Sequence, residues 1–325
     1  MVCGCMTKNK TIFIIGGAGY IGSHMAKIAH KVGYDVVTVD NLSTGHRDSV
    51  LYGKFEFCDI LDTDKLDKLF KKYKPDAVMH FGAYSLVGES VMEPYKYYNN
   101  NVSGTLELLK TMIDNNCMKF IFSSSAAIFG NPKYIPIDES HPKDPINPYG
   151  KSKLMVEEIL KDFEYAYGLK YVSFRYFNAA GHDPDGELSE RHNPETHLLP
   201  IIMQAANGQR DSVSIFGNDY DTKDGTCIRD YIHVNDLVNA HLKGLNYLNQ
   251  SASSSEEFNL GNGDGFSVKE VIQKVKEITG KDFIVKEEGR RDGDPSILIS
   301  SSEKSRGTLK FRINYPNLKD IIQTL

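Results

Sequence analysis

Runs of consecutive apolar residues alternate with amphipathic stretches through the first half of the chain. The runs predict strands at Thr11–Ile15, Asp35–Asp40, Phe55–Cys58, Ala77–Phe81, Lys119–Ser124 and Lys170–Phe177. Helices are predicted between them at about Tyr20–Lys31, Asp64–Tyr73, Val102–Asn115 and Tyr149–Tyr167. The strand runs are continuously apolar, which indicates burial on both faces of a parallel sheet. The pattern therefore predicts a doubly wound α/β domain.

The composition of the sequence changes after Phe177, where Gly, Pro, Asp and His become frequent. We therefore predict a flexible tail at 1–10, a first domain at 11–178 and a smaller C-terminal α/β domain at 179–325. The second domain has predicted helices at about Leu199–Asn207 and Asn235–Leu248, and a third that begins at Ser267. Ser267 and Glu270 form a capping box there. The serine-rich segment 251–257 is interpreted as a polar surface loop.

A glycine-rich segment, Gly-Gly-Ala-Gly-Tyr-Ile-Gly at 16–22, joins the first strand to the first helix. Glycines allow a tight turn, a close approach of the backbone to a pyrophosphate, and close packing of helix on strand. A lone glycine pattern is weak evidence, but here a strand precedes it and a helix follows. The expected contacts are Gly16, Gly19, Tyr20, Ile21 and Gly22. The motif predicts a Rossmann-type dinucleotide site.

Two acidic positions extend this site. Asp40 ends the second strand, where a carboxylate accepts hydrogen bonds from ribose hydroxyls and repels a 2′-phosphate, so NAD is favoured over NADP. Asp59 and Ile60 follow the third strand at the same edge of the sheet. They are interpreted as adenine contacts, with a simple turn as a nearly equal alternative.

Tyr149 and Lys153 form Tyr-x-x-x-Lys at the start of a predicted helix, which places both on one face. A lysine ammonium and a positive nicotinamide would lower the pKa of the phenol and make it a base. Such a pair alone is more often a solvated helix face. Pro148 fits a helix start, however, and Ser125 closes the fifth strand at the edge where ligands bind in such folds. We expect Tyr149, Lys153 and Ser125 to be catalytic.

The segments at 16–24, 39–45 (Val-Asp-Asn-Leu-Ser-Thr-Gly), 123–125 and 149–153 resemble the UDP-glucose 4-epimerase family of extended short-chain dehydrogenases/reductases. Further blocks match the same family: Arg-Tyr-Phe-Asn at 175–178, Ile-Phe-Gly-Asn-Asp-Tyr at 215–220, Asp-Gly-Thr at 224–226, Arg-Asp-Tyr-Ile-His-Val at 229–234 and Arg-Arg-Asp-Gly-Asp at 290–294. The resemblance covers nearly the whole chain from Thr11.

The resemblance implies interconversion of UDP-galactose and UDP-glucose with tightly bound NAD. It implies that Tyr149 takes the proton of the 4-hydroxyl, that a 4-keto sugar turns within the site, and that reduction on its other face inverts C4. Further cofactor contacts are expected at Asn41, Ser43, Phe81, Ala83, Asn100, Ser123 and Tyr176, beside Tyr149 and Lys153. Substrate contacts are expected at Ser125, Asn178, Leu198, Phe216, Arg229, Tyr231, Arg291 and Asp294. The arginine forks suit a pyrophosphate, with a surface ion pair as the alternative.

The sequence departs from the family pattern at three positions. Ser85 stands where some members have a lysine that contacts NAD. His197 stands where an asparagine is frequent. Leu298 stands at the position thought to limit bulk near the sugar 2-position, so acceptance of N-acetylated sugars stays open.

Three other functions compete with this hypothesis. A 4,6-dehydratase needs an acid and a base beside the active-site hydroxyl, whereas Ala126 and Ala127 follow Ser125 here. A 4-epimerase acting on another UDP-sugar, such as a pentose or uronic acid, remains open. A non-catalytic NAD-sensing module needs no phenolic base, so an intact Tyr149 and Lys153 argue against it.

Composition narrows the function less than the motifs do. The 325 residues carry a net charge of −5, which offers no electrostatic reason for binding nucleic acid or an anionic membrane. Five scattered cysteines suit a reducing compartment, and no apolar run suggests a membrane span, so a cytoplasmic location is expected. No metal site is predicted, since Cys3 and Cys5 lack further ligands nearby. The family resemblance implies a homodimer.

Overall fold

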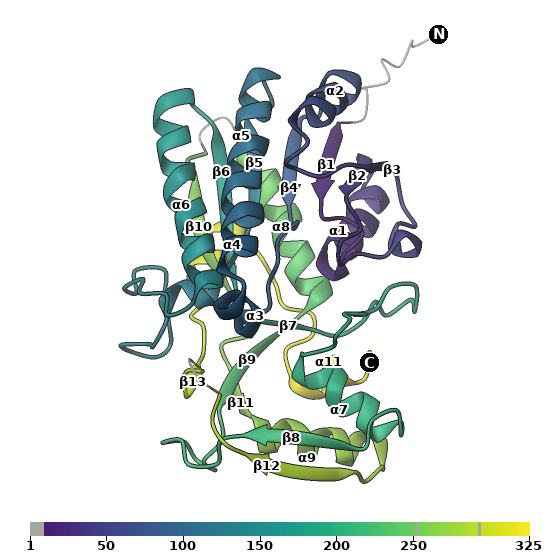
Figure 1. Cartoon of the computed structure of the whole chain (residues 1–325), viewed down its shortest axis with the longest axis vertical. Coiled ribbons are helices and arrows are strands. Elements are labelled where there is room, and N and C mark those ends of the chain that lie inside the picture. Colours follow the sequence, from purple (N-terminus) through teal and green to yellow (C-terminus); the bar gives the residue numbers. More distant parts are fainter. Residues whose placement is uncertain (1–9, 251–252, 292–293) are drawn as a thin grey trace.

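The computed structural model describes residues 10–250, 253–291 and 294–325. Cys3, Cys5 and nearly all of the predicted tail at 1–10 lie outside these residues. Figure 1 shows a large sheet flanked by helices, with a smaller group of strands and helices packed below it. This arrangement gives the expected pairing of an α/β layer with a smaller α/β part.

The large sheet has seven parallel strands in the order β10-β6-β5-β4-β1-β2-β3. The strands are β1 (Thr11–Ile15), β2 (Asp35–Asp40), β3 (Lys54–Phe57), β4 (Ala77–His80), β5 (Lys119–Ser125), β6 (Lys170–Tyr176) and β10 (Glu256–Leu260). From β3 to β6 this is the strand order of the dinucleotide-binding fold. The six predicted strands are confirmed to within one residue at each end.

Helices cover both faces of this sheet. One face carries α2 (Thr63–Tyr73), α5 (Thr105–Asp114) and α6 (Pro148–Tyr167), and the other carries α1 (Tyr20–Lys31), α8 (Val234–Leu248) and α10 (Glu303–Leu309). Phe13 and Ile15 of β1 join the first core, whereas Ile12 and Ile14 join the second. Successive side chains of a strand point to opposite faces of the sheet. Because both faces are buried, the odd and the even positions of each strand must both be apolar. This explains the continuous apolar runs in the sequence.

The C-terminal part is shared between the two layers. Helix α8 and strand β10 belong to the large layer, and β10 begins at Glu256, inside the segment that was interpreted as a loop. The smaller layer contains β7 (Asn178–Ala180), α7 (Leu198–Ala206), β8 (Ser212–Phe216), β9 (Ile228–His233), β11 (Gly265–Ser267), α9 (Val268–Thr279), β12 (Ile284–Glu288), β13 (Ile297–Leu298) and α11 (Leu318–Ile322). The predicted capping box is confirmed, because Ser267 and Glu270 bond reciprocally at the start of α9.

Short elements complete the large layer. Helices α3 (Val87–Met92) and α4 (Pro94–Tyr97) precede α5, and a π-helical stretch at Tyr98–Gly104 joins α4 to α5. A 3-10 turn at Ala126–Phe129 follows β5 directly and packs against α6. These connections lie at the carboxyl edge of the sheet, where side chains from several strands can meet. Among the described residues, no helix is long and apolar enough to cross a lipid bilayer.

Candidate active site

The glycines between β1 and α1 have different physical roles. Gly16 has φ +77°, and a Cβ there would lie 2.5 Å from the Gly82 nitrogen; a Cβ at Gly22 would lie 2.2 Å from the Gly16 oxygen. Backbone packing therefore leaves no room for a side chain at either position. A Cβ at Gly19 would meet only the Gly16 oxygen, at 3.3 Å, so this glycine faces open space. Gly19 is also the N-cap of α1 and has no capping side chain. The first turn of α1 is thus available to a phosphate.

Asp40 lies beside this loop at the end of β2. Its two carboxylate oxygens accept the backbone N–H groups of Ala18 at 2.9 Å and Leu42 at 2.7 Å. Burial raises the pKa of Asp40, and these two hydrogen bonds oppose the rise. Each oxygen keeps a free lone pair for a ribose hydroxyl. The loop and the acid therefore fit the diphosphate and ribose of NAD.

The predicted cofactor residues that follow β2 and β3 hydrogen-bond to one another. The Asn41 side-chain amide donates to Asp59 at 2.7 Å, and the Ser43 N–H donates to Asn41 at 3.0 Å. The Ile60 side chain is 6% exposed and belongs to the core beneath α2 and α5, so only its backbone is available to a ligand. The Tyr20 hydroxyl donates to the Gly181 carbonyl at 2.5 Å and ties α1 to the smaller layer. A cofactor contact by Tyr20 would likewise use its backbone.

A buried asparagine shapes the segment after β4. Asn101 accepts the Tyr84 N–H at 3.0 Å, and its amide donates to the Tyr84 carbonyl at 3.0 Å and to Ser152 at 3.2 Å. The predicted contacts Phe81 and Ala83 lie on this segment, and the Asn100 amide donates to Asn101 at 2.9 Å. Asn101 therefore joins this segment to α6. Sequence reasoning singled out Asn100 and missed its neighbour, although both belong to an asparagine run.

The three predicted catalytic residues come together at the carboxyl edge of β5. Ser125 ends β5, and its hydroxyl accepts the Ala127 N–H at 3.1 Å. Tyr149 lies in the first turn of α6, close enough to Ser125 for that hydroxyl to lower the pKa of the phenol. Lys153, one turn further along α6, donates to the Ser123 carbonyl at 2.7 Å. The Lys153 Nζ lies 5.8 Å from the centre of the Tyr149 ring. The spacing in sequence thus places these groups on one face.

Burial governs the charge of both helix residues. Lys153 is 3% exposed, and burial lowers its pKa to about 7. Burial also raises the pKa of Tyr149, although the nearby Ser125 hydroxyl opposes the rise. Burial by itself therefore favours the neutral phenol. A positive charge in the cofactor cradle would favour the phenolate.

The sequence reasoning missed an ion pair beneath the catalytic residues. Glu157 accepts hydrogen bonds from Arg175 Nε at 2.9 Å and Nη2 at 2.8 Å, and from the Ser124 hydroxyl at 2.6 Å. All three residues are at most 1% exposed. They join α6, β6 and β5 directly behind Ser125. The glutamate four residues after Lys153 was the available signal, because that spacing places it on the same helix face.

The predicted substrate residues lie mainly on the smaller layer. Asn178 of β7 pairs with Tyr231 of β9, Leu198 begins α7, and Phe216 ends β8. Arg229 forms an ion pair with Asp294 and donates to the Ile228 carbonyl at 2.9 Å. The Arg291 guanidinium lies 3.8 Å from the centre of the Phe216 ring. Three pairs of predicted substrate residues are therefore neighbours in the structure.

Leu298 links the two layers near the catalytic serine. Strand β13 pairs with β9 so that Leu298 lies opposite Arg229. Its side chain packs against the small core of Ala126, Ile128, Phe129 and Ile137, which follows Ser125 in the chain. The residue suspected of limiting sugar bulk thus lies between a predicted diphosphate contact and the Ser125 turn.

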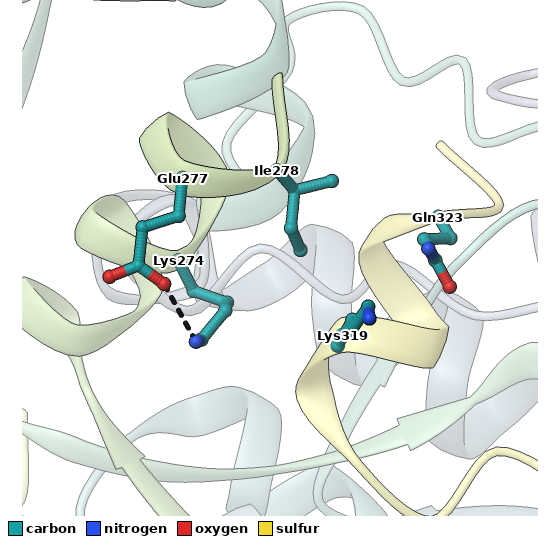
Figure 2. Close-up of a pocket in the computed structure, with 5 residues that line it drawn as sticks. All are labelled: Lys274, Glu277, Ile278, Lys319 and Gln323. Atoms are coloured by element: carbon teal, nitrogen blue, oxygen red, sulfur yellow. Dashed lines mark hydrogen bonds and ion pairs between the residues drawn. The ribbon is translucent and has the colours of Figure 1, made fainter. Parts of the chain in front are cut away.

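A surface hollow elsewhere carries none of these residues. It lies between α9 and α11, and its lining consists of Lys274, Glu277, Ile278, Lys319 and Gln323 (Figure 2). Lys274 pairs with Glu277 at 2.7 Å. Figure 1 shows α9 and α11 in the lower part of the molecule, away from β5 and the upper turns of α6. The hollow is a solvated groove between two helices.

The sequence of residues 12–261 matches the family described as the NAD dependent epimerase/dehydratase family. The chain belongs to this family. It is 49% identical over 312 residues to the UDP-glucose 4-epimerase of Halalkalibacterium halodurans, covering 96% of this chain and 93% of that protein. The family resemblance inferred from the motifs is therefore confirmed.

Solved structures of family members agree with the fold. The UDP-glucose 4-epimerase of Brucella ovis in complex with NAD has a TM-score of 0.94 and 47% identity, with 97% of each chain covered. The UDP-Glc/GlcNAc 4-epimerase of Campylobacter jejuni has a TM-score of 0.85 and 44% identity, covering 97% of this chain and 98% of that one. The similarity extends through both layers.

Proposed function

We propose that the protein interconverts UDP-galactose and UDP-glucose, with NAD as a retained cofactor. Eight similar proteins, all UDP-glucose 4-epimerases, are between 41% and 49% identical to the chain over at least 91% of its length. The observation that carries the proposal is the convergence of Ser125, Tyr149 and Lys153 at the carboxyl end of β5, on the same edge of the sheet as the open glycine loop. A dinucleotide sensor would not need the pair Ser125 and Tyr149.

The residues divide the chemistry between them. Bound NAD would supply the reversible oxidation of C4 of the sugar. Tyr149 takes the proton from the 4-hydroxyl, while Ser125 holds the reacting oxygen by a hydrogen bond. Lys153 is anchored on Ser123 and lies on the same helix face, where it favours the phenolate while it carries its proton. Once the 4-keto sugar has turned and C4 has been reduced on its other face, Tyr149 returns the proton to the C4 oxygen, which completes the inversion.

Epimerisation requires that the nucleotide be held firmly while the hexose turns. We assign the nucleotide to the smaller layer. Arg229 and Arg291 would bind the diphosphate, with Asn178, Leu198, Phe216, Tyr231 and Asp294 around it. The Arg229–Asp294 pair is oriented by the Ile228 carbonyl, which keeps the guanidinium fork in place. The hexose would lie between these residues and Ser125, near Leu298.

UDP-N-acetylglucosamine is a second candidate substrate. The similarity to the Campylobacter jejuni UDP-Glc/GlcNAc enzyme favours this possibility. Leu298 is the residue that would discriminate, because its side chain packs close to the Ser125 turn. Replacing Leu298 with Ala would widen the site. The variant should therefore raise the ratio of turnover with UDP-N-acetylglucosamine to turnover with UDP-glucose.

We further propose that the protein acts as a homodimer in the cytoplasm. Apolar side chains on α5 and α6 support the dimer, since Leu106, Met155, Tyr165 and Tyr167 are at least 40% exposed. The described cysteines Cys58, Cys117 and Cys227 are free, which agrees with a reducing compartment.

Conversion of UDP-galactose without added cofactor tests the proposed function. Purified protein is incubated with the sugar nucleotide, and UDP-glucose is measured by chromatography. Conversion is expected because a retained cofactor is regenerated in each turnover. Protein that carries NAD but converts none of the sugar would overturn the glucose/galactose assignment. UDP-N-acetylhexosamines and UDP-pentoses would then be tested, and failure on all of them would favour a sensor.

A further inference from the structure

A mixed cluster of two glutamates and two histidines lies between β7 and α7, outside the residues assigned to the reaction. Glu190, His192, Glu195 and His197 each present one ligand atom, and these atoms all lie within 4.8 Å of one another. His197 Nδ1 lies 2.8 Å from Glu190 Oε1 and 2.9 Å from Glu195 Oε1. His192 Nδ1 lies 3.1 Å from the same Glu190 oxygen. Imidazole nitrogen and carboxylate oxygen together are a zinc donor set.

One ligand atom in this cluster is buried without a partner. The Glu190 side chain is 2% exposed, and its Oε2 has no hydrogen-bond partner. A buried carboxylate with an unsatisfied oxygen is unfavourable unless a cation neutralises it. In the part of the chain that the structure describes, no lysine or arginine forms an ion pair with Glu190 or Glu195. The cluster therefore holds two carboxylates whose negative charge no lysine or arginine balances.

A neighbouring acidic cluster shows the contrasting case. Asp183, Asp185 and Glu187 also lie close together, but Lys27 Nζ is 2.5 Å, 2.7 Å and 2.7 Å from their carboxylates. The ammonium group lies within ion-pair distance of all three carboxylates, so a side-chain cation already occupies that cluster. Acidic clustering alone therefore does not mark a metal site in this segment.

We propose that Glu190, His192, Glu195 and His197 bind one divalent transition-metal ion of the class Zn²⁺, Co²⁺ or Ni²⁺, which accepts imidazole and carboxylate together. Ligands around a tetrahedral ion at about 2.1 Å are about 3.4 Å apart, so the observed spacing needs only a small opening. The two carboxylates balance the ionic charge. The histidine side chains are 29% and 39% exposed, which leaves the ion a path from solvent.

The position of the cluster gives the ion a structural role. His197 is the N-cap of α7, and the next residue, Leu198, is a proposed substrate contact. The His192 ring lies 6.3 Å from the ring of Tyr20, which follows the glycine loop. A bound ion would therefore hold the segment that joins the cofactor layer to α7. It would touch neither the reacting sugar nor Tyr149.

A proton is the competing occupant. Burial opposes the charged form of His197, but its hydrogen bonds to Glu190 and Glu195 outweigh this and raise the pKa of His197 to about 10. A protonated His197 would supply one positive charge against two carboxylates. A divalent ion supplies two.

Metal titration of the full-length protein distinguishes the two occupants. Protein without a histidine tag, carrying Cys3→Ser and Cys5→Ser to remove the N-terminal thiols, is freed of metal with a chelator. Co²⁺ is then added and its ligand-field absorption recorded, and Zn²⁺ binding is measured by calorimetry. We expect one ion per chain, with Zn²⁺ displacing Co²⁺ and raising the melting temperature.

Matched variants locate the site. His192→Ala and Glu190→Gln should each lower the affinity at least about tenfold and abolish the Zn²⁺-dependent rise in melting temperature. His30→Ala, at an exposed histidine outside the cluster, should bind as the parent does. The partly exposed His192 can be removed even if Glu190→Gln fails to fold. Absence of stoichiometric binding, or equal binding by His192→Ala, would overturn the proposal and leave the proton as the occupant.

Discussion

Tyr149 lies near Ser125 in a buried environment that raises the pKa of its phenol. Tyr149→Phe removes the proton acceptor but keeps the ring that packs near Tyr97. Turnover should fall about 10²–10⁴-fold, while bound NAD should remain, because the glycine loop is unchanged. Turnover is measured with UDP-galactose, and retained NAD is measured after denaturing the protein. An unchanged rate would contradict the assignment of Tyr149 as the base.

Glu157 is a buried carboxylate whose charge depends on Arg175. Although burial favours the neutral acid, the hydrogen bonds and charge of Arg175 hold its pKa below the usual range. Arg175→Met should therefore lower the free energy of unfolding by about 3–5 kcal/mol, because it leaves the buried Glu157 with Lys143, 3.2 Å away, as its remaining cationic partner. Denaturant unfolding measures the change. The double variant Glu157→Leu/Arg175→Met should recover much of the loss; a double variant less stable than the single one would contradict this explanation.

At the scale of single residues, the sequence predicted groups that act within a short segment. Gly16 and Gly22 have no room for a side chain and Gly19 is open, because the turn between strand and helix determines their backbone. The Glu157–Arg175 pair was not predicted, because its partners belong to different elements and only their burial makes the contact important. The raised pKa of Tyr149 likewise depends on burial.

The capping box at the start of α9 is an element whose contribution can be measured directly. Ser267 accepts the Glu270 N–H at 3.1 Å and also donates to Asp224. Ser267→Ala should cost about 1–2 kcal/mol of unfolding free energy, because an N–H of the first turn loses its acceptor. Ser254→Ala is the matched control, since Ser254 is exposed and its hydrogen bonds are 3.3 Å and 3.4 Å long. Equal costs for both variants would contradict a specific capping contribution.

At the scale of elements, periodicity located the strands and helices of the large layer well. Each strand is buried on both faces and each helix on one, so the hydrophobic pattern matches the element. Strand β10 was missed because Glu256 and Glu257 begin it with two charged residues. Its place in the sheet comes from parallel pairing with β6, in which Phe258 lies opposite Phe174. That pairing joins segments about eighty residues apart and leaves no local signal.

Buried histidines should make the whole molecule sensitive to acid. Burial lowers the pKa of His24 to about 4 and those of His80, His233 and His241 to about 3. Histidine in the unfolded chain has a pKa of about 6.5. Below this pH the unfolded chain binds protons that the buried histidines of the folded chain do not bind. The stabilisation from these four histidines should be full above this pH and fall as the pH drops from about 6.5 towards 5. Each histidine adds a slope of up to about 1.4 kcal/mol per pH unit.

Urea unfolding at several pH values between 7 and 5 measures this slope. His80→Gln should flatten it, because one buried imidazole is removed. Stability that is constant or rises as the pH falls through this range would contradict the prediction.

The proposed dimer gives a second prediction for the whole molecule. Leu106→Glu together with Met155→Glu places charges among the exposed apolar residues of α5 and α6, so it should shift the protein to a monomer. Ile284→Glu is the control, because Ile284 is 62% exposed but lies on β12 of the smaller layer. Light scattering after size-exclusion chromatography measures the mass. A monomeric parent protein, or a dimer that survives the double substitution, would overturn the proposed interface.

The sequence alone determined the doubly wound layer, the glycine loop with Asp40, and the Ser125, Tyr149 and Lys153 group. These features depend on periodicity and on short spacings within one strand, turn or helix, which the chain carries locally. The tertiary structure decided the position of β10 and the buried Glu157–Arg175 pair. Those features depend on which distant segments meet and on how far their charges are removed from water, and neither can be read from local pattern.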